Sequence, residues 1–211
     1  MLRYAISDRA RFAGGDHSRQ AELMSIVEQW ATDGIEFIQL REKDLEAREL
    51  AVLARRIMSS LRSSGGHSRL LINSRLDVAV AVEADGVHLT SALGGLTPAQ
   101  VRSLYAEASL PEPVISVSCH SVEEVAAARD ASVIMILFGP VFEKRVGADL
   151  VSAGTGLDLL RTACRVAAPV PVLALGGITQ ANTPACLAAG VAGIAAIRLF
   201  TPGLTGTALG E

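Results

Sequence analysis

The chain has 211 residues, of which 50% are hydrophobic, 19% are charged and only 4% are aromatic, and its formal net charge is −3. This composition excludes a disordered chain, and the charge gives no broad positive field for binding nucleic acid. Apolar runs such as residues 133–138 are far shorter than the roughly 20 residues of a membrane-spanning helix, so neither nucleic acid nor a membrane is an expected partner.

Short apolar runs alternate with longer amphipathic stretches about every 26 residues along the chain. With so few aromatic residues, the core must consist of Ala, Val, Leu and Ile, which is typical of parallel sheets covered by helices. The pattern predicts eight strands, at residues 2–7, 35–40, 70–73, 86–89, 114–118, 133–138, 171–175 and 193–197.

Helices are predicted between these strands. The apolar positions of residues 46–61 share one helical face. Ser121, with Glu124 three residues later, forms a predicted capping box, and Thr97 and Thr179 are two further predicted helix caps.

Eight strand–helix units without a linker rich in Pro, Gly or Ser predict one domain over residues 1–211. The expected fold is a single (β/α)8 TIM barrel of the α/β class. Its last helix, within residues 201–211, is expected to be short or truncated. An open, doubly wound sheet is the alternative.

The chemistry of such a barrel lies at the carboxyl ends of its strands. Gln39, Arg41 and Lys43 alternate after the second predicted strand, so they are expected to face one side and to present two cations to a phosphate or pyrophosphate. The alternative is a solvated loop in which Glu42 and Asp44 pair with these cations.

Two further features suit a phosphorylated ligand. Gly176 and Gly177 follow the seventh predicted strand, where backbone N–H groups and a helix N-terminus favour a phosphate. His120 ends the fifth strand and is the candidate general acid/base, the alternative being a histidine that caps the next helix. His88, inside the fourth strand, favours a structural role.

No metal site is predicted. Cys119, Cys164 and Cys186 have no metal-ligand spacing, and no Asp-x-Asp pair follows a strand. The odd number of cysteines and the lack of a secretory signal favour the reducing cytoplasm.

Five ordered segments between Tyr4 and about Phe200 carry a family resemblance. They are residues 37–43 (Phe-Ile-Gln-Leu-Arg-Glu-Lys), 72–89, 116–124, 138–142 (Phe-Gly-Pro-Val-Phe) and 174–178 (Ala-Leu-Gly-Gly-Ile). Together they resemble the thiamine phosphate synthase/TenI superfamily, which implies a (β/α)8 barrel. The resemblance to the synthase branch implies that Gly177 contacts a thiazole phosphate and that a pyrimidine diphosphate is contacted by Gln39, Arg41, Lys43, Asn73 and Ser118.

The sequence also departs from the synthase pattern. The resemblance implies Mg²⁺ bound by an Asp directly after Asn73 and by an acidic residue after the fourth strand, but this chain has Ser74 and, at residues 90–93, Thr-Ser-Ala-Leu. The Pro-Thr clamp for pyrophosphate is missing from residues 142–147. The cations available to replace lost contacts are Lys144, Arg145 and Arg198, the last standing where the family often has Ser.

These departures favour the TenI branch. The resulting hypothesis is a thiazole tautomerase that needs no cofactor, with His120 as general acid/base and Gly176 and Gly177 as phosphate anchor. Two alternatives stay open: a thiamine phosphate synthase that joins a pyrimidine diphosphate to a thiazole phosphate with Mg²⁺, and a noncatalytic thiamine-phosphate binder or regulator. The resemblance further implies a homodimer, in which a second copy would cover apolar surface near Leu199 and Phe200.

Overall fold

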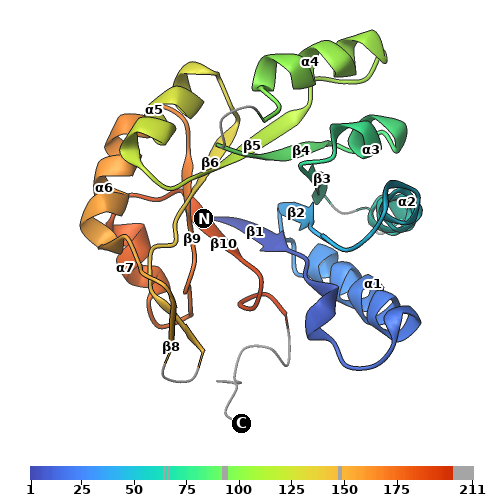
Figure 1. Cartoon of the computed structure of the whole chain (residues 1–211), viewed down its shortest axis with the longest axis horizontal. Coiled ribbons are helices and arrows are strands. Elements are labelled where there is room, and N and C mark those ends of the chain that lie inside the picture. Colours follow the sequence, from blue (N-terminus) through green and yellow to red (C-terminus); the bar gives the residue numbers. More distant parts are fainter. Residues whose placement is uncertain (64, 66, 92–94, 147–148, 202–211) are drawn as a thin grey trace. The chain divides into compact units, whose positions relative to one another are not determined.

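The computed structural model describes residues 1–63, 65, 67–91, 95–146 and 149–201 (Figure 1). The strands are β1 (Leu2–Ile6), β2 (Phe37–Leu40), β3 (Arg69–Asn73), β4 (Gly86–Thr90), β5 (Val114–Cys119), β6 (Met135–Phe138), β7 (Lys144–Val146), β8 (Asp149–Ser152), β9 (Val172–Leu175) and β10 (Gly193–Ala196). The helices are η1 (Arg9–Arg11), α1 (Asp16–Thr32), α2 (Ala47–Ser63), α3 (Leu76–Ala81), α4 (Pro98–Glu107), α5 (Val122–Asp130), α6 (Gly156–Ala167) and α7 (Thr183–Ala188).

The strand order is that of a closed barrel, β1-β10-β9-β6-β5-β4-β3-β2, with helices between successive strands. This order confirms the predicted (β/α)8 fold class. All eight predicted strands are present, and their starts and ends differ from the prediction by at most two residues, as in β6, which begins at Met135.

The chain divides into two compact units, which are described separately. The first unit is Met1–Arg3, Leu89–Pro98 and Ile115–Glu211, and the second is Tyr4–His88 and Ala99–Val114. One domain over residues 1–211 stays a prediction. None of the helices in the described ranges is both long and apolar enough to cross a membrane.

In the second unit, α1, α2 and α3 lie outside strands β1 to β3 (Figure 1). The predicted amphipathic face of α2 is buried, with Leu53 and Ile57 almost fully inaccessible, which is why this helix packs on the strands. Gln39 of β2 pairs with Ile6 of β1 and Leu71 of β3 in parallel register. The carboxyl ends of β1, β2 and β3 are therefore neighbours.

In the first unit, β5, β6 and β9 are neighbours, with parallel pairing throughout. The predicted capping of α5 is confirmed, because the Ser121 hydroxyl accepts the Glu124 N–H at 3.2 Å. Thr179 caps the turn that precedes α7 rather than α7 itself. Its hydroxyl accepts the Asn182 N–H at 3.2 Å, its N–H donates to Oδ1 of Asn182 at 2.8 Å, and α7 begins at Thr183.

An antiparallel hairpin of β7 and β8 follows β6 and was not predicted. Its strands are short, and their sequence, which begins Lys-Arg, lacks the apolar alternation of a buried strand. The truncated last helix that was predicted within residues 201–211 falls almost wholly on residues 202–211, outside the described residues.

Candidate functional site

Polar side chains are buried where the first three strands of the second unit end. The group consists of Ser7, Gln39, Arg41, Glu42 and Asn73, called here the β1–β3 cluster. Ser7 and Gln39 are each 1% exposed and Glu42 is 6% exposed. Buried polar groups at the carboxyl ends of barrel strands are typical of ligand-binding sites.

Gln39 and Asn73 are joined directly. The Gln39 side-chain amide donates from Nε2 to Oδ1 of Asn73 at 2.7 Å. The other Gln39 side-chain atom, Oε1, is buried and accepts no hydrogen bond from any described residue. Because buried acceptors are nearly always satisfied, this oxygen is suited to a ligand N–H group.

Arg9 pairs with Glu42 of this cluster and with the nearby Asp44. Its Nη1 lies 2.7 Å from Oδ1 of Asp44 and 3.6 Å from Oε2 of Glu42. Within the described residues no carboxylate pairs with Arg41 or Lys43. The alternative in which Glu42 and Asp44 pair with Arg41 and Lys43 therefore does not hold, because both carboxylates pair with Arg9 instead.

Arg41 and Lys43 lie in different surroundings. Arg41 is half-buried, whereas Lys43 is exposed in the turn after β2, because β2 ends at Leu40 and the strand alternation stops there. Burial lowers the pKa of His88 to about 3, and the positive charge of Arg41 adds to this effect. The positive charge of Arg41 thus disfavours the protonated form of the buried His88 imidazole on β4.

His88 agrees with the predicted structural role. It is 4% exposed, and its Nδ1 lies 3.5 Å from the Tyr4 hydroxyl. With a pKa of about 3, the imidazole is neutral at physiological pH.

The predicted residues of the first unit lie around residues 139–142, which follow β6. His120 is exposed after β5, and its Nδ1 is hydrogen-bonded to the Gly139 carbonyl oxygen. Because a carbonyl only accepts, Nδ1 carries a proton in this contact. Cys119 points away into the core, where burial raises the pKa of its thiol to about 12, so the two residues form no dyad.

Gly176 and Gly177 contact the same segment from the end of β9. Their φ angles are +91° and +66°, in the left-handed region that favours glycine. A Cβ on Gly176 would lie 2.6 Å from Cα of Pro140, and one on Gly177 would lie 2.7 Å from Cβ of Phe142. The glycine pair is thus required for close packing against residues 139–142, in addition to its predicted role at a phosphate.

The remaining predicted residues are dispersed. Ser118 is half-buried on β5, and Arg198 is exposed after β10. Lys144 and Arg145 belong to β7.

The donor set does not fit a protein-held Mg²⁺ ion. In the described part of the chain no group of three or more His, Cys, Asp or Glu side chains could hold a metal. Ser74, at φ +56°, and Thr90 offer hydroxyl groups where carboxylates would be needed, and residues 92–93 lie outside the described residues.

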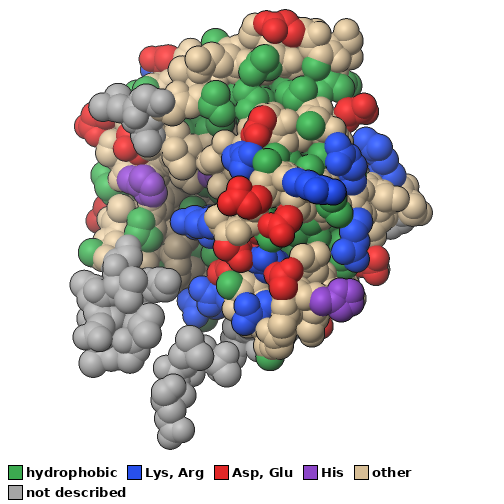
Figure 2. Space-filling view, turned by 45° about the vertical axis from the view of Figure 1, so that its right-hand side comes forward, with side chains coloured by type: hydrophobic (Ala, Val, Ile, Leu, Met, Phe, Trp, Pro, Cys, Tyr) green, Lys and Arg blue, Asp and Glu red, His purple; other side chains and the backbone are tan. Residues whose placement is uncertain are grey.

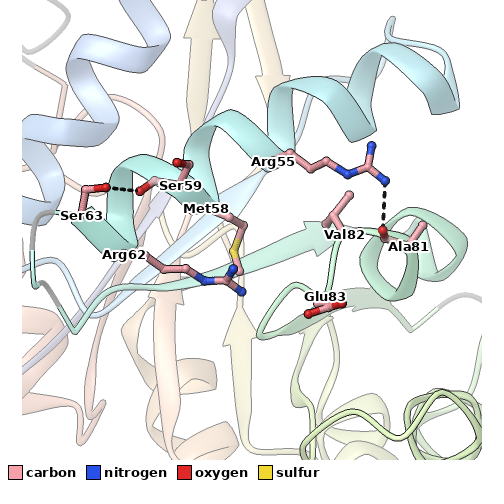
Figure 3. A pocket seen from close by; sticks show the side chains of 8 residues that line it. All are labelled: Arg55, Met58, Ser59, Arg62, Ser63, Ala81, Val82 and Glu83. Atoms are coloured by element: carbon pink, nitrogen blue, oxygen red, sulfur yellow. Dashed lines mark hydrogen bonds between the residues drawn. The ribbon is translucent and has the colours of Figure 1, made fainter.

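A cavity of about 500 Å³ lies elsewhere in the second unit, between α2 and α3 (Figure 3). It is lined by residues that include Arg55, Arg62 and Glu83, and Arg55 donates to the Ala81 carbonyl at 3.0 Å. These residues precede β3 and β4, so the cavity lies at the opposite ends of these strands from Asn73. Basic and acidic side chains are interspersed on the face shown in Figure 2, without a large patch of one sign.

Sequence reasoning missed Arg9 as a site residue and treated Glu42 only as a counter-ion. The available signal was position: Arg9 lies just after β1, and Glu42 just after β2. Only the fold shows that these two charged residues are buried together.

The closed parallel barrel, with its polar cluster and glycine pair at strand ends, defines a (β/α)8 protein with polar groups where such barrels bind their ligands. The family model described as thiamine monophosphate synthase matches residues 4–200, and the chain belongs to this family.

Individual relatives agree. The chain is 42% identical over 194 residues to a putative thiamine-phosphate synthase of Geobacter sulfurreducens, an alignment that covers 92% of this chain and 84% of that protein. It is 35% identical over 195 residues to the thiamine-phosphate synthase of Methanospirillum hungatei, covering 92% and 86%. The solved thiamine phosphate pyrophosphorylase of Pyrococcus furiosus superposes with a TM-score of 0.72 at 26% identity, covering 97% of this chain and 89% of that one.

These relatives overturn the predicted thiazole tautomerase and its assignment as an isomerase. They are named as synthases, which are transferases, and they match nearly the whole chain. The prediction gave too much weight to the missing carboxylates at Ser74 and after β4. A tautomerase that needs only a phosphate anchor and His120 would leave the buried β1–β3 cluster without a function.

Proposed function

We propose that this protein is a thiamine-phosphate synthase, a transferase that joins a pyrimidine diphosphate to a thiazole phosphate with departure of pyrophosphate. The second unit would bind the pyrimidine diphosphate and the first unit the thiazole phosphate. The names of the relatives support this activity.

The observation that carries the proposal is the charge arrangement of the β1–β3 cluster. Glu42 and Asp44 lie against Arg9, and within the described residues no carboxylate forms an ion pair with Arg41 or Lys43, so both cations are open to an anionic ligand. A guanidinium fork and an ammonium group suit a diphosphate, and they would stabilise the negative charge that develops on departing pyrophosphate. Oε1 of Gln39 would accept a hydrogen bond from the pyrimidine part.

The thiazole phosphate would bind at Gly176 and Gly177. Gly176 and Gly177 bring no side chain of their own to the turn after β9, so their backbone N–H groups would be offered to the phosphate. Asn182 supports this turn by donating from Nδ2 to the Gly177 carbonyl at 2.9 Å. His120 and Arg198 stay predicted site residues, and Ser118 stays a predicted contact of the pyrimidine diphosphate.

Mg²⁺ would have to be held mainly by substrate oxygens, because the described chain offers no carboxylate cluster for it. No step is therefore assigned to a protein-bound metal. Arg41 and Lys43 are two cations that this chain itself supplies, and Lys144, Arg145 and Arg198 stay predicted ones.

The test is to incubate the purified protein with both substrates, with and without Mg²⁺, and to detect thiamine phosphate and pyrophosphate by mass spectrometry. Product is expected with the wild type and should fall strongly with Arg41→Ala. Glu112→Gln, which removes an exposed carboxylate paired with Arg102, is the matched control and should keep wild-type activity. The absence of product at high enzyme concentration would overturn the proposal.

Two further expectations accompany this function. A homodimer is supported by the resemblance, and light scattering in solution would test it. A cytoplasmic location is supported by the free state of Cys119, Cys164 and Cys186, and fractionation of the source cells would test it.

A further inference from the structure

The end of β1 is bonded to the backbone of β2 on both sides of Leu40. The Ser7 N–H donates to the Gln39 carbonyl at 2.9 Å, and the Ser7 hydroxyl oxygen accepts the Arg41 N–H at 2.8 Å. Ser7 therefore fixes the main chain of Gln39 and Arg41, two of the residues that the proposed function assigns to the pyrimidine diphosphate. Its hydroxyl does so beyond the last residue of either strand.

Glu42 fixes the orientation of this hydroxyl. Because the Ser7 oxygen accepts from Arg41, its own hydrogen is free to point at Oε1 of Glu42, which lies 2.5 Å away. A carboxylate at this position can only accept, so it selects the one hydroxyl orientation that leaves an oxygen lone pair for the Arg41 N–H.

Arg9 in turn holds Glu42 in place. The Arg9 N–H donates to Oε2 of Glu42 at 3.1 Å, and the Arg9 guanidinium lies 3.6 Å from the same oxygen. The guanidinium also pairs with Asp44 at 2.7 Å and with Asp16 of α1 at 2.8 Å. Ser7, Arg9 and Glu42 are all at least nine-tenths buried, so the geometry is set by packing rather than by mobile surface side chains.

We infer that Glu42, acting through Ser7, is a positioning residue for the diphosphate: it fixes the backbone that carries Gln39 and Arg41 without contacting the substrate. This inference rests on the proposed function. It predicts that damage to the Ser7–Glu42 contact weakens binding of the diphosphate and leaves binding of the thiazole phosphate unchanged.

The test compares Glu42→Gln, Ser7→Ala and Ser7→Thr with the wild type. In Glu42→Gln an NH2 group takes the place of one carboxylate oxygen and faces a hydrogen-bond donor, the Ser7 hydroxyl or the Arg9 N–H. Ser7→Ala removes the hydroxyl, and Ser7→Thr keeps it. The KM for the pyrimidine diphosphate should rise about tenfold or more in the first two variants, because small misplacements of binding groups are costly, and less than about threefold in Ser7→Thr. The KM for the thiazole phosphate should stay within about twofold in all three.

A purely structural role gives a different result. Loss of folded protein would lower kcat and leave both KM values unchanged, and circular dichroism would record it. If Glu42→Gln fails to fold, the comparison of Ser7→Ala with Ser7→Thr decides. Unchanged KM for the diphosphate in a folded Ser7→Ala variant would overturn the inference.

Calorimetry with inorganic pyrophosphate separates this inference from the proposed function. If the wild type forms no thiamine phosphate, the proposed function is wrong and the inference falls with it. If the wild type is active and binds pyrophosphate, and folded Glu42→Gln and Ser7→Ala bind it equally well, only the inference is wrong.

Discussion

Replacement of Gly176 by Ala tests whether this glycine serves packing. The new Cβ would lie 2.6 Å from both Cα and Cβ of Pro140, a distance that real Cβ atoms do not tolerate, so backbone must move. At φ +91° the residue also adopts a conformation that costs an L-residue about 1–2 kcal/mol. Forced overpacking adds about 1–3 kcal/mol.

The chain supplies a matched control in Gly156, the first residue of α6. Its φ is +80°, but a Cβ there would meet no atom within 4 Å. Gly156→Ala should therefore cost only the backbone term of about 1–2 kcal/mol.

Urea denaturation of the two variants and the wild type gives the difference in the free energy of unfolding directly. Gly176→Ala should be less stable than Gly156→Ala by about 1–3 kcal/mol. Because residues 139–142 would shift, the KM for the thiazole phosphate should also rise in Gly176→Ala alone. Equal stability of the two alanine variants would refute the argument that close approach requires Gly176.

Three other predictions follow from single residues. Ser121→Ala should lower the free energy of unfolding by about 0.5–2 kcal/mol in a urea melt, because the Glu124 N–H loses its cap, and an unchanged value would contradict this role. The pKa of His88 is about 3 in the folded chain and near 6.5 when unfolded. Between pH 3 and pH 6.5 only the unfolded chain takes up this proton, so the free energy of unfolding falls with falling pH by up to about 1.4 kcal/mol per pH unit. Urea denaturation between pH 7 and pH 5 should show a shallower dependence of the free energy of unfolding on pH for His88→Gln than for the wild type. An identical dependence would exclude His88 as the cause. Ser74→Asp should lower the Mg²⁺ concentration for half-maximal synthase activity, whereas Ser132→Asp, at the same φ of +56°, should not; equal Mg²⁺ responses would remove the case for position 74.

The barrel could be predicted from the sequence because its signal is local. Each parallel strand is an apolar run such as residues 133–138, and the helix at residues 46–61 shows its buried face in the spacing of its leucines. The hairpin of β7 and β8 could not be predicted in this way, since two short paired strands outside the barrel need no apolar face. The position of Thr179 also misled, because a Thr–Asn turn and a helix cap use the same residue types.

The candidate site was predictable in its positions and less so in its charges. Gln39 follows from its position near a strand end and Asn73 from the family resemblance, and the structure joins their side chains. That Glu42 and Asp44 belong to Arg9 rather than to Arg41 and Lys43 depends on how β1 and β2 align, a contact between residues more than thirty positions apart. No spacing in one segment of sequence contains that information.

The hydroxyl of Ser7 also has a consequence for the thermodynamics of ligand capture. Segments that follow a strand usually lose conformational entropy when a ligand orders them, and this loss weakens binding. The Arg41 amide is already bonded to a buried oxygen, so this backbone is ordered before any ligand arrives. At Arg41 only the side chain is then left to be immobilised by a ligand. Slow hydrogen exchange at the Arg41 amide in the ligand-free protein would show that its backbone is ordered in advance.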